Sequence, residues 1–364
     1  MLDTVPERTR SVDPLARDVA IVAIGTAVPG NAVSQDEMRE RARKAYPQFA
    51  HIDTLYANTG IKQRYVCEAR DWYLAPHTWE ERTEVFQRHA LDLMERAARA
   101  AVDEAGIAFE DIGALVVNTI TGLAVPSLDA KLMNRLPFAP HVERLPIFGF
   151  GCGGGVAGLA RASRLARTMP GGAVMFVTVD LCSLCLRIND PSMPMFVAGA
   201  LFGDGAVAVI LRNTEGSGDD GASLPRIGAT GDHLWRETEA IMGWDVKNDG
   251  FGIVLSVQLP ALMEQRFGPA ADAFLARNGL TRADIDGYLL HPGGGKILDV
   301  ADRVLGLAPD ALRPSRDTLR DFGNMSSATA MFVLKNARDS GRRGRHLLAA
   351  FGPGFSAYFA IVDL

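Results

Sequence analysis

Residues 148–155 read Phe-Gly-Phe-Gly-Cys-Gly-Gly-Gly, and a stretch of small and apolar residues, Val-Ala-Gly-Leu-Ala-Arg-Ala, follows over 156–162. An apolar run, a cysteine between glycines and a small-residue helix are typical of a sharp turn from strand to helix. Glycines allow positive φ and let a substrate approach the backbone, and the positive end of the following helix would favour a thiolate. Cys152 is therefore a candidate nucleophile. The plainer alternative is a small buried cysteine in a packing turn.

The composition limits the class of protein. The chain has 364 residues, 48% of them hydrophobic, which is enough for about two domains with an extensive core. The net charge of −5 argues against a nucleic-acid partner. We find neither a signal-peptide core nor an apolar run of the ~18 residues that span a bilayer, so we expect a cytoplasmic protein without a membrane span. The spacing Cys182-Ser-Leu-Cys185 lacks partners for a zinc site, so no metal is expected.

Apolar runs and helical periodicity alternate along the chain and predict an α/β protein. Residues 180–200, rich in Pro and Met, are expected to form a loop. The polar, glycine-rich run over 212–223 is the expected linker between halves over 1–215 and 216–364. Strands are expected over 19–25, 114–118, 172–179, 206–211, 287–290, 346–351 and 356–363, and helices over 86–105, 128–136, 259–278, 296–306 and 327–338.

Two further junctions between a strand and a helix carry a reactive residue: His291 in His-Pro-Gly-Gly-Gly and Asn324 in Phe-Gly-Asn-Met-Ser-Ser. A nucleophilic thiol needs a cation or donor beside it, and imidazole is the usual one. Asn adds a donor that never loses its proton, so the two would form an oxyanion hole for a thioester carbonyl. Singly, each has a structural explanation, as a core histidine or a helix cap. Together with Cys152 they predict an active site.

Five segments resemble the signature segments of the type III polyketide synthases, the chalcone-synthase-like family. They follow family order and spacing over nearly the whole chain and are Gly-Phe-Gly-Cys-Gly-Gly-Gly at Cys152, Leu201-Phe-Gly-Asp-Gly-Ala206, His291-Pro-Gly-Gly, Gly323-Asn-Met-Ser-Ser327 and Phe351-Gly-Pro-Gly354. The resemblance implies a thiolase fold of two αβαβα halves packed as a five-layered structure. It also implies a homodimer and a Cys-His-Asn site at the end of a CoA tunnel.

The resemblance assigns roles to these residues. Cys152, in the first half, would accept the acyl group, and His291 and Asn324, in the second, would polarise the thioester carbonyl of malonyl-CoA. Phe202 matches the family's gatekeeper between tunnel and cavity. The implied reaction is iterative decarboxylative Claisen condensation of malonyl-CoA onto an acyl-CoA starter, followed by cyclisation. It needs no cofactor besides the CoA thioester substrates.

The residues expected around the substrate depart from the plant pattern of the family. Ile253 stands at the second gatekeeper position, Trp244 replaces a small residue, and Cys182 and Cys185 replace threonines. The segments over 121–128, which contains Val125, and over 242–246 resemble the bacterial branch that makes alkylpyrones and alkylresorcinols from fatty acyl starters. We therefore expect a medium or long fatty acyl starter. Further substrate-binding candidates are Ser326 and, for the CoA phosphates, Lys62, Arg64 and Lys296.

The sequence leaves three alternatives open. Cys185 at a cavity-lining position resembles tetrahydroxynaphthalene-forming relatives and favours a malonyl-primed synthase. A ketoacyl-carrier-protein synthase III shares the fold and the three residue types, but His291-Pro-Gly-Gly differs from the His-Gln-Ala-Asn segment usual there. An inactive lipid-binding dimer partner would be expected to lose the nucleophile or the histidine, and both are present.

Overall fold

A large mixed sheet forms the centre of the protein, whose computed structural model describes residues 19–49, 51–169, 171–214 and 224–364. Within these residues, nine strands pair in the order β11-β12-β13-β8-β1-β7-β6-β4-β5. They are β1 (Val19–Ala27), β4 (Ile112–Asn118), β5 (Glu143–Ile147), β6 (Ala173–Leu181), β7 (Asp204–Asn213), β8 (Arg226–Leu234), β11 (Gly287–Leu290), β12 (Arg345–Gly352) and β13 (Ser356–Asp363).

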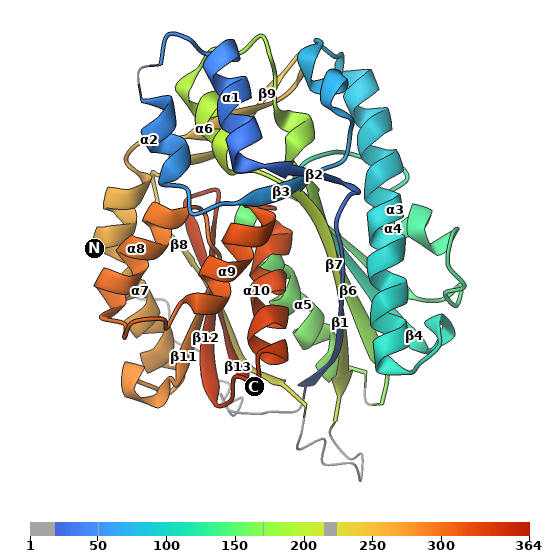
Figure 1. The fold of residues 1–364 in the computed structure, drawn as a ribbon. Coiled ribbons are helices and arrows are strands. Elements are labelled where there is room, and N and C mark those ends of the chain that lie inside the picture. Colours follow the sequence, from blue (N-terminus) through green and yellow to red (C-terminus); the bar gives the residue numbers. More distant parts are fainter. Residues whose placement is uncertain (1–18, 50, 170, 215–223) are drawn as a thin grey trace, which may run out of the picture.

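Helices and the two parts of this sheet form alternating layers. A short pairing of β1 with β8, in which Val19 faces Ile227, joins its two parts. Figure 1 shows α3 (Trp79–Ala105) on the outer face of one part and α7 (Leu259–Arg277) with α8 (Gly295–Leu305) outside the other. Helices α5 (Gly154–Arg167) and α10 (Ser327–Asp339) lie between the two parts. The layers therefore run α, β, α, β, α, and the predicted five-layered thiolase fold is confirmed.

Three hydrophobic cores fill the spaces between the layers. The first packs α3 against β1, β6 and β7, the second encloses α5 and α10, and the third packs α7 and α8 against β11–β13. Helix α3 begins at a capping box, in which the Thr78 side chain accepts from Glu81 N, and ends at Gly106 with φ 63°. Burying apolar faces on both sides of the sheet accounts for its continuous apolar strands.

Smaller elements gather at one end of the layers, at the top of Figure 1. They include two hairpins, β2 (Asn31–Ser34) with β3 (Gln63–Val66) and β9 (Met242–Lys247) with β10 (Gly250–Leu255). The remaining helices of the described chain are α1 (Gln35–Ala45), α2 (Ile52–Ala57), α4 (Leu128–Met133), α6 (Met193–Leu201) and α9 (Arg313–Phe322).

Some local expectations were wrong. The loop expected over 180–200 contains helix α6, because Ser192 caps it by accepting from Met195 N and Pro194 sits in the first turn, where no backbone donor is needed. The helix expected over 128–136 ends at Met133. Of the expected linker, residues 212–213 belong to strand β7, and 215–223 lie outside the described residues, as does the predicted boundary between the halves.

Candidate active site

Cys152 lies in a 3₁₀ turn, Gly151–Gly153, that connects β5 to α5. Gly151 has φ +51°, and a Cβ there would lie 2.5 Å from Pro353 Cδ. A Cβ on Gly155 would lie 2.2 Å from the backbone oxygen of Ser327, at the start of α10. Glycines are thus required for the turn itself and for the close contact between α5 and α10. The turn brings Cys152 against the second half of the chain.

His291 follows β11 and is held through its backbone. Its N–H donates to Ala349 O (2.8 Å), which extends the parallel pairing of β11 with β12. The residue is 3% exposed, and neither ring nitrogen has a hydrogen-bond partner among the described residues. An imidazole kept buried and unpartnered is free to bind a substrate oxygen or to accept a proton.

Asn324 lies between α9 and α10, so the prediction that it follows a strand was wrong. It connects the turn after His291 to the segment that carries Phe202. Its Nδ2 donates to Gly293 O (3.3 Å), and its backbone exchanges hydrogen bonds with Leu201 O and Gly203 N, both at 2.9 Å. Phe202 is thereby fixed beside Asn324. The Oδ1 atom accepts from Ser326 N (2.9 Å), which fixes the amide so that its donor group keeps one N–H for a ligand.

One cavity of about 610 Å³ receives all three side chains. Its lining includes Cys152, His291, Asn324 and Phe202, and Lys296 lies in the same wall. The rest of the wall is mainly apolar and comes from α2, α6, β9, β10 and the start of α7, with Met193, Val197, Leu255, Val257 and Met263 among its residues. The predicted constellation of Cys, His and Asn is therefore brought together in space.

The thiol and the imidazole are both neutral in this environment. Burial raises the pKa of Cys152 to about 12, although hydrogen bonds with Ser326 and Asn324 act in the opposite direction. Burial also lowers the pKa of His291 to about 3. This differs from the resting thiolate expected from the sequence: the sulfur is so well shielded from water that desolvation outweighs the donors around it.

Asp180, at the end of β6, is a buried carboxylate that the sequence reasoning missed. Its oxygens accept from Ile120 N (2.8 Å) and Ser327 N (3.0 Å), and also from the Ser327 hydroxyl. Burial raises its pKa, and its charge in turn raises the pKa of Cys152. Asp180 thus fixes the loop after β4 and the start of α10 behind the nucleophile. A lone acidic residue ending an apolar strand was the available signal.

Beyond Cys152 lie two smaller pockets. The first, of about 50 Å³, is lined by Cys152 together with Phe202, Ile120, Cys182, Trp244, Ile253 and Ser326. The second, of about 30 Å³, is lined by Thr121, Cys185, Phe251 and Arg82. Most predicted wall residues are therefore in place, but Cys185 faces the second pocket rather than the one that contains Cys152. Trp244 is fixed by donating Nε1–H to Ile120 O (2.8 Å).

The other predicted residues lie elsewhere. Val125 is 98% exposed on the loop after β4, and Lys62 is exposed; neither lines any of these three cavities. Arg64 is wrong as a phosphate-binding candidate, because it is fully buried and donates to backbone oxygens of residues 199, 200 and 202. Its guanidinium stabilises the end of α6 instead.

A buried cysteine with a His at a strand end and an Asn between two helices, in a five-layered α/β fold, defines a condensing-enzyme type of thiolase-fold protein. Family models confirm the class. The model described as chalcone and stilbene synthases, N-terminal domain, matches residues 7–215, and the corresponding C-terminal domain model matches 228–361. The chain therefore belongs to the chalcone and stilbene synthase family, the type III polyketide synthases, and is an acyl-transferring enzyme of that class.

Individual relatives agree. The chain is 35% identical to the 1,3,6,8-tetrahydroxynaphthalene synthase of Streptomyces peucetius subsp. caesius, over 99% of this chain and 96% of that protein. It is 33% identical to the phloroglucinol synthase of Pseudomonas fluorescens, over 92% and 95%. The crystal structure of 1,3,6,8-tetrahydroxynaphthalene synthase from Streptomyces coelicolor A3(2) superimposes with a TM-score of 0.87 and 30% identity, over 94% of this chain and 99% of that one.

None of the helices in the described part of the chain has the length and hydropathy for a membrane crossing.

Proposed function

We propose that this protein condenses malonyl-CoA with an acyl-CoA starter, using Cys152 as nucleophile and His291 with Asn324 as the site of enolate stabilisation. The observation that carries the proposal is the shared cavity of about 610 Å³, into which Cys152 and His291 project from junctions between a strand and a helix and Asn324 from the connection between α9 and α10. The cavity is mainly apolar, and Lys296 in its wall is a candidate partner for the CoA phosphates.

The neutral state of the site determines the order of proton transfers. Because the pKa of Cys152 is about 12 and that of His291 about 3, the sulfur must lose its proton as it attacks. A ring nitrogen of His291 accepts that proton while Sγ bonds to the acyl carbon, and the proton then leaves with the CoA sulfur. The acyl group is now a thioester on Cys152, and His291 is neutral again.

The second substrate uses the same polar atoms. Malonyl-CoA loses CO₂, and the electron pair of the broken C–C bond becomes an enolate whose oxygen accepts hydrogen bonds from His291 and Asn324. The enolate carbon then attacks the acyl carbonyl on Cys152, forms the new C–C bond and expels the sulfur. Repeated extension and ring closure follow.

For the starter, we propose a medium or long fatty acyl group, giving alkylpyrone or alkylresorcinol-type products. The two pockets beyond Cys152 support this, because the same three segments line both of them. Ile120, Cys182 and Ile253 line the first pocket, and their sequence neighbours Thr121, Cys185 and Phe251 line the second. An acyl chain leaving Cys152 would enter the first pocket and continue toward the second. Each methylene buried against such apolar walls contributes about 0.8 kcal/mol.

A malonyl-primed reaction is the second candidate. The first pocket, about 50 Å³, is small beside the cavity of about 610 Å³. The names of the two similar synthases, tetrahydroxynaphthalene and phloroglucinol synthase, describe hydroxylated rings without an alkyl chain. A short starter fits the pocket as it stands, whereas a long one requires Trp244 or Phe251 to move.

We further propose the homodimer expected from the family resemblance. Val125, predicted to contact substrate, is 98% exposed and so would reach a cavity in a partner chain rather than in its own.

The starter is tested by measuring kcat/KM for acetyl-, hexanoyl- and lauroyl-CoA with malonyl-CoA, and for malonyl-CoA alone. We expect lauroyl-CoA to be preferred, and Ile253→Phe to lower its kcat/KM by about tenfold, since overfilling a packed pocket costs about 1–3 kcal/mol. Val246→Phe is the matched control, because Val246 is exposed on the same hairpin. Equal output from malonyl-CoA alone, with no gain from longer starters, would establish malonyl priming instead.

A further inference from the structure

A short 3₁₀ turn, Cys182–Cys185, forms one wall of both acyl pockets. Cys182 lines the pocket that contains Cys152, and Cys185 lines the second pocket. Ser183, between them, is 0% exposed and lines neither pocket. The position of this turn therefore sets the dimensions of both pockets, and whatever holds it acts on the acyl chain without touching the thioester.

A carboxylate holds the beginning of the Cys182–Cys185 turn. Asp204, at the start of β7, accepts from Ser183 N (2.8 Å) at Oδ1, and from Cys67 N (2.8 Å) and Ser183 Oγ (2.5 Å) at Oδ2. Both oxygens accept from backbone N–H groups, so an amide in this place would turn a donor toward a donor. Asp204 is 0% exposed, and burial raises its pKa to about 6.

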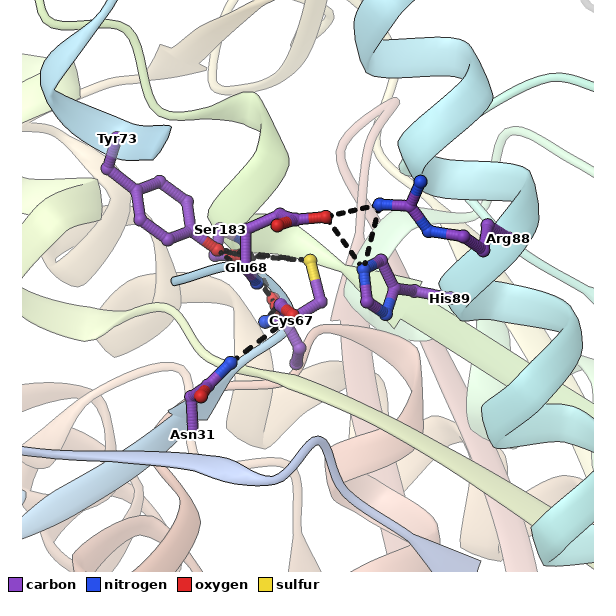
Figure 2. A network of polar contacts seen from close by, with 8 residues as sticks. Asn31, Cys67, Glu68, Tyr73, Arg88, His89 and Ser183 are labelled. Atoms are coloured by element: carbon purple, nitrogen blue, oxygen red, sulfur yellow. Dashed lines mark hydrogen bonds and ion pairs between the residues drawn. The ribbon is translucent and has the colours of Figure 1, made fainter. Parts of the chain in front are cut away.

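A tyrosine supports the serine from the other side. Figure 2 shows Tyr73 and Ser183 converging beside Cys67, with the Tyr73 hydroxyl 2.7 Å from Ser183 Oγ. Because Ser183 donates to Asp204, Tyr73 donates to Ser183. The Tyr73 oxygen also accepts from Glu68 N (3.2 Å), and the Glu68 carboxylate pairs with Arg88 and His89 of α3. The beginning of the turn is thus tied through this network to α3.

A guanidinium holds the other end of the Cys182–Cys185 turn. Arg82, also from α3, donates from Nη1 to Leu184 O (2.5 Å) and Leu186 O (3.1 Å). It is 9% exposed and lies over the Trp72 ring, 5.4 Å from its centroid. A carboxylate at the N–H end of a helical turn and a guanidinium at its carbonyl end both match the dipole of the turn. The wall is therefore held from both ends by buried charged side chains.

We propose that Asp204 and Arg82, acting through Ser183 and the backbone of the Cys182–Cys185 turn, are positioning residues that determine which acyl chain lengths this enzyme accepts. The inference rests on the proposed condensing function and deepens it. Neither residue lines the cavity that contains His291 and Asn324, so decarboxylation of malonyl-CoA does not depend on them. Arg82 also lines the second pocket, whereas Asp204 lines neither pocket and acts only through the turn. Loosening the turn removes the fixed partition between the two pockets, and discrimination between chain lengths falls.

The test compares Ser183→Ala and Asp204→Asn with wild type, and adds Arg82→Met, whose side chain also lines the second pocket. The readouts are kcat/KM for acetyl-, hexanoyl- and lauroyl-CoA, the lengths of the products by mass spectrometry, and CO₂ release from malonyl-CoA. We expect the ratio between the best and the poorest starter to fall by about tenfold, the scale for altering the fit of a hydrophobic pocket, with CO₂ release within about twofold of wild type. If malonyl-CoA is the only starter used, the distribution of product lengths is the equivalent readout.

Two further variants separate positioning from general loss of stability. Ser163→Ala removes a hydroxyl from another fully buried serine, which bonds Ala160 O within α5, and should leave the starter ratio unchanged. Tyr73→Phe keeps the ring and removes the donor to Ser183. It should lower the ratio of kcat/KM between the best and the poorest starter less than Ser183→Ala does. A folded Ser183→Ala protein with the wild-type ratio of kcat/KM between the best and the poorest starter would overturn the inference, as would a uniform loss of all activities. A wild type that releases no CO₂ would instead overturn the proposed function.

Discussion

The reactive centre and the wall of the acyl pockets line cavities that meet at Cys152, and they differ in how free their polar atoms are. The centre is positioned by hydrogen bonds to the backbone, such as His291 N to Ala349 O and those that Asp180 accepts from Ile120 N and Ser327 N, and the imidazole nitrogens have no partner among the described residues. The wall is positioned by charged side chains, Asp204 and Arg82, whose oxygens and Nη1 are bound to the Cys182–Cys185 turn. The reaction needs polar atoms that are shielded from water and free to bind the substrate. A pocket that selects acyl chains by length needs a wall of fixed shape.

The largest effect that would test this contrast is expected from Cys152→Ala. The variant should make no condensation product, because no other group accepts the acyl chain, yet it should release some CO₂ from malonyl-CoA through His291 and Asn324. Product formation and ¹⁴CO₂ release are measured side by side, with the unfolding temperature as a control for folding. If Cys152→Ala made polyketide at the wild-type level, Cys152 would not be the nucleophile. If the wild type released no CO₂, the inactive lipid-binding alternative would be favoured.

A smaller effect is expected from Asn324→Ala. Loss of one oxyanion donor should lower malonyl-CoA decarboxylation by about 10²-fold, while acyl loading of Cys152 persists. Acyl loading is followed by intact-protein mass spectrometry. Asn336→Ala is the matched control, because the Asn336 amide donates to Pro314 O on the α9 side of α10 and does not line the cavity. Unchanged CO₂ release in Asn324→Ala would contradict the role assigned to this amide.

The sequence predicted the reactive centre well because each part has a local signal. Buried strands are continuous apolar runs, and the predicted ranges 287–290 and 356–363 coincide with β11 and β13. The residue after such a strand, beside glycines, is placed by topology at one edge of the sheet. Cys152 and His291 could therefore be grouped before any distance was available, whereas Asn324 was grouped with them on an assignment to a strand end that the structure does not show.

The wall could not be predicted in the same way. The hairpin β9–β10 has apolar residues at alternate positions, Met242, Trp244 and Val246 with Phe251, Ile253 and Leu255, but this strand signal does not say which cavity the hairpin faces. Arg82 reads as one more charge on a helix, and its partners lie on a turn distant in the sequence. Asp204 was visible in Leu201-Phe-Gly-Asp-Gly-Ala206, but its role depends on which backbone groups face it.

The smallest expected effect concerns the charge state of Cys152, where sequence and structure disagree. A helix N-terminus and a histidine favour a thiolate at neutral pH, whereas burial in the folded protein raises the pKa of Cys152 to about 12. Well below its pKa, the thiolate fraction of a thiol rises tenfold per pH unit. Alkylation of Cys152 by iodoacetamide should therefore be slow at pH 7 and rise about 10²-fold by pH 9 without levelling off, unlike an ordinary thiol of pKa ≈ 8.5.

Peptide mass spectrometry resolves the four cysteines. Cys152 should react first, because it is 9% exposed and lines the large cavity, whereas Cys67, Cys182 and Cys185 are between 1% and 5% exposed. His291→Ala is the informative comparison: with a neutral imidazole of pKa about 3, its removal should leave the slope of rate against pH unchanged. A rate independent of pH between 6 and 9 in wild type, lost in His291→Ala, would instead show a preformed ion pair between Cys152 and His291, and the burial argument for a neutral site would fail.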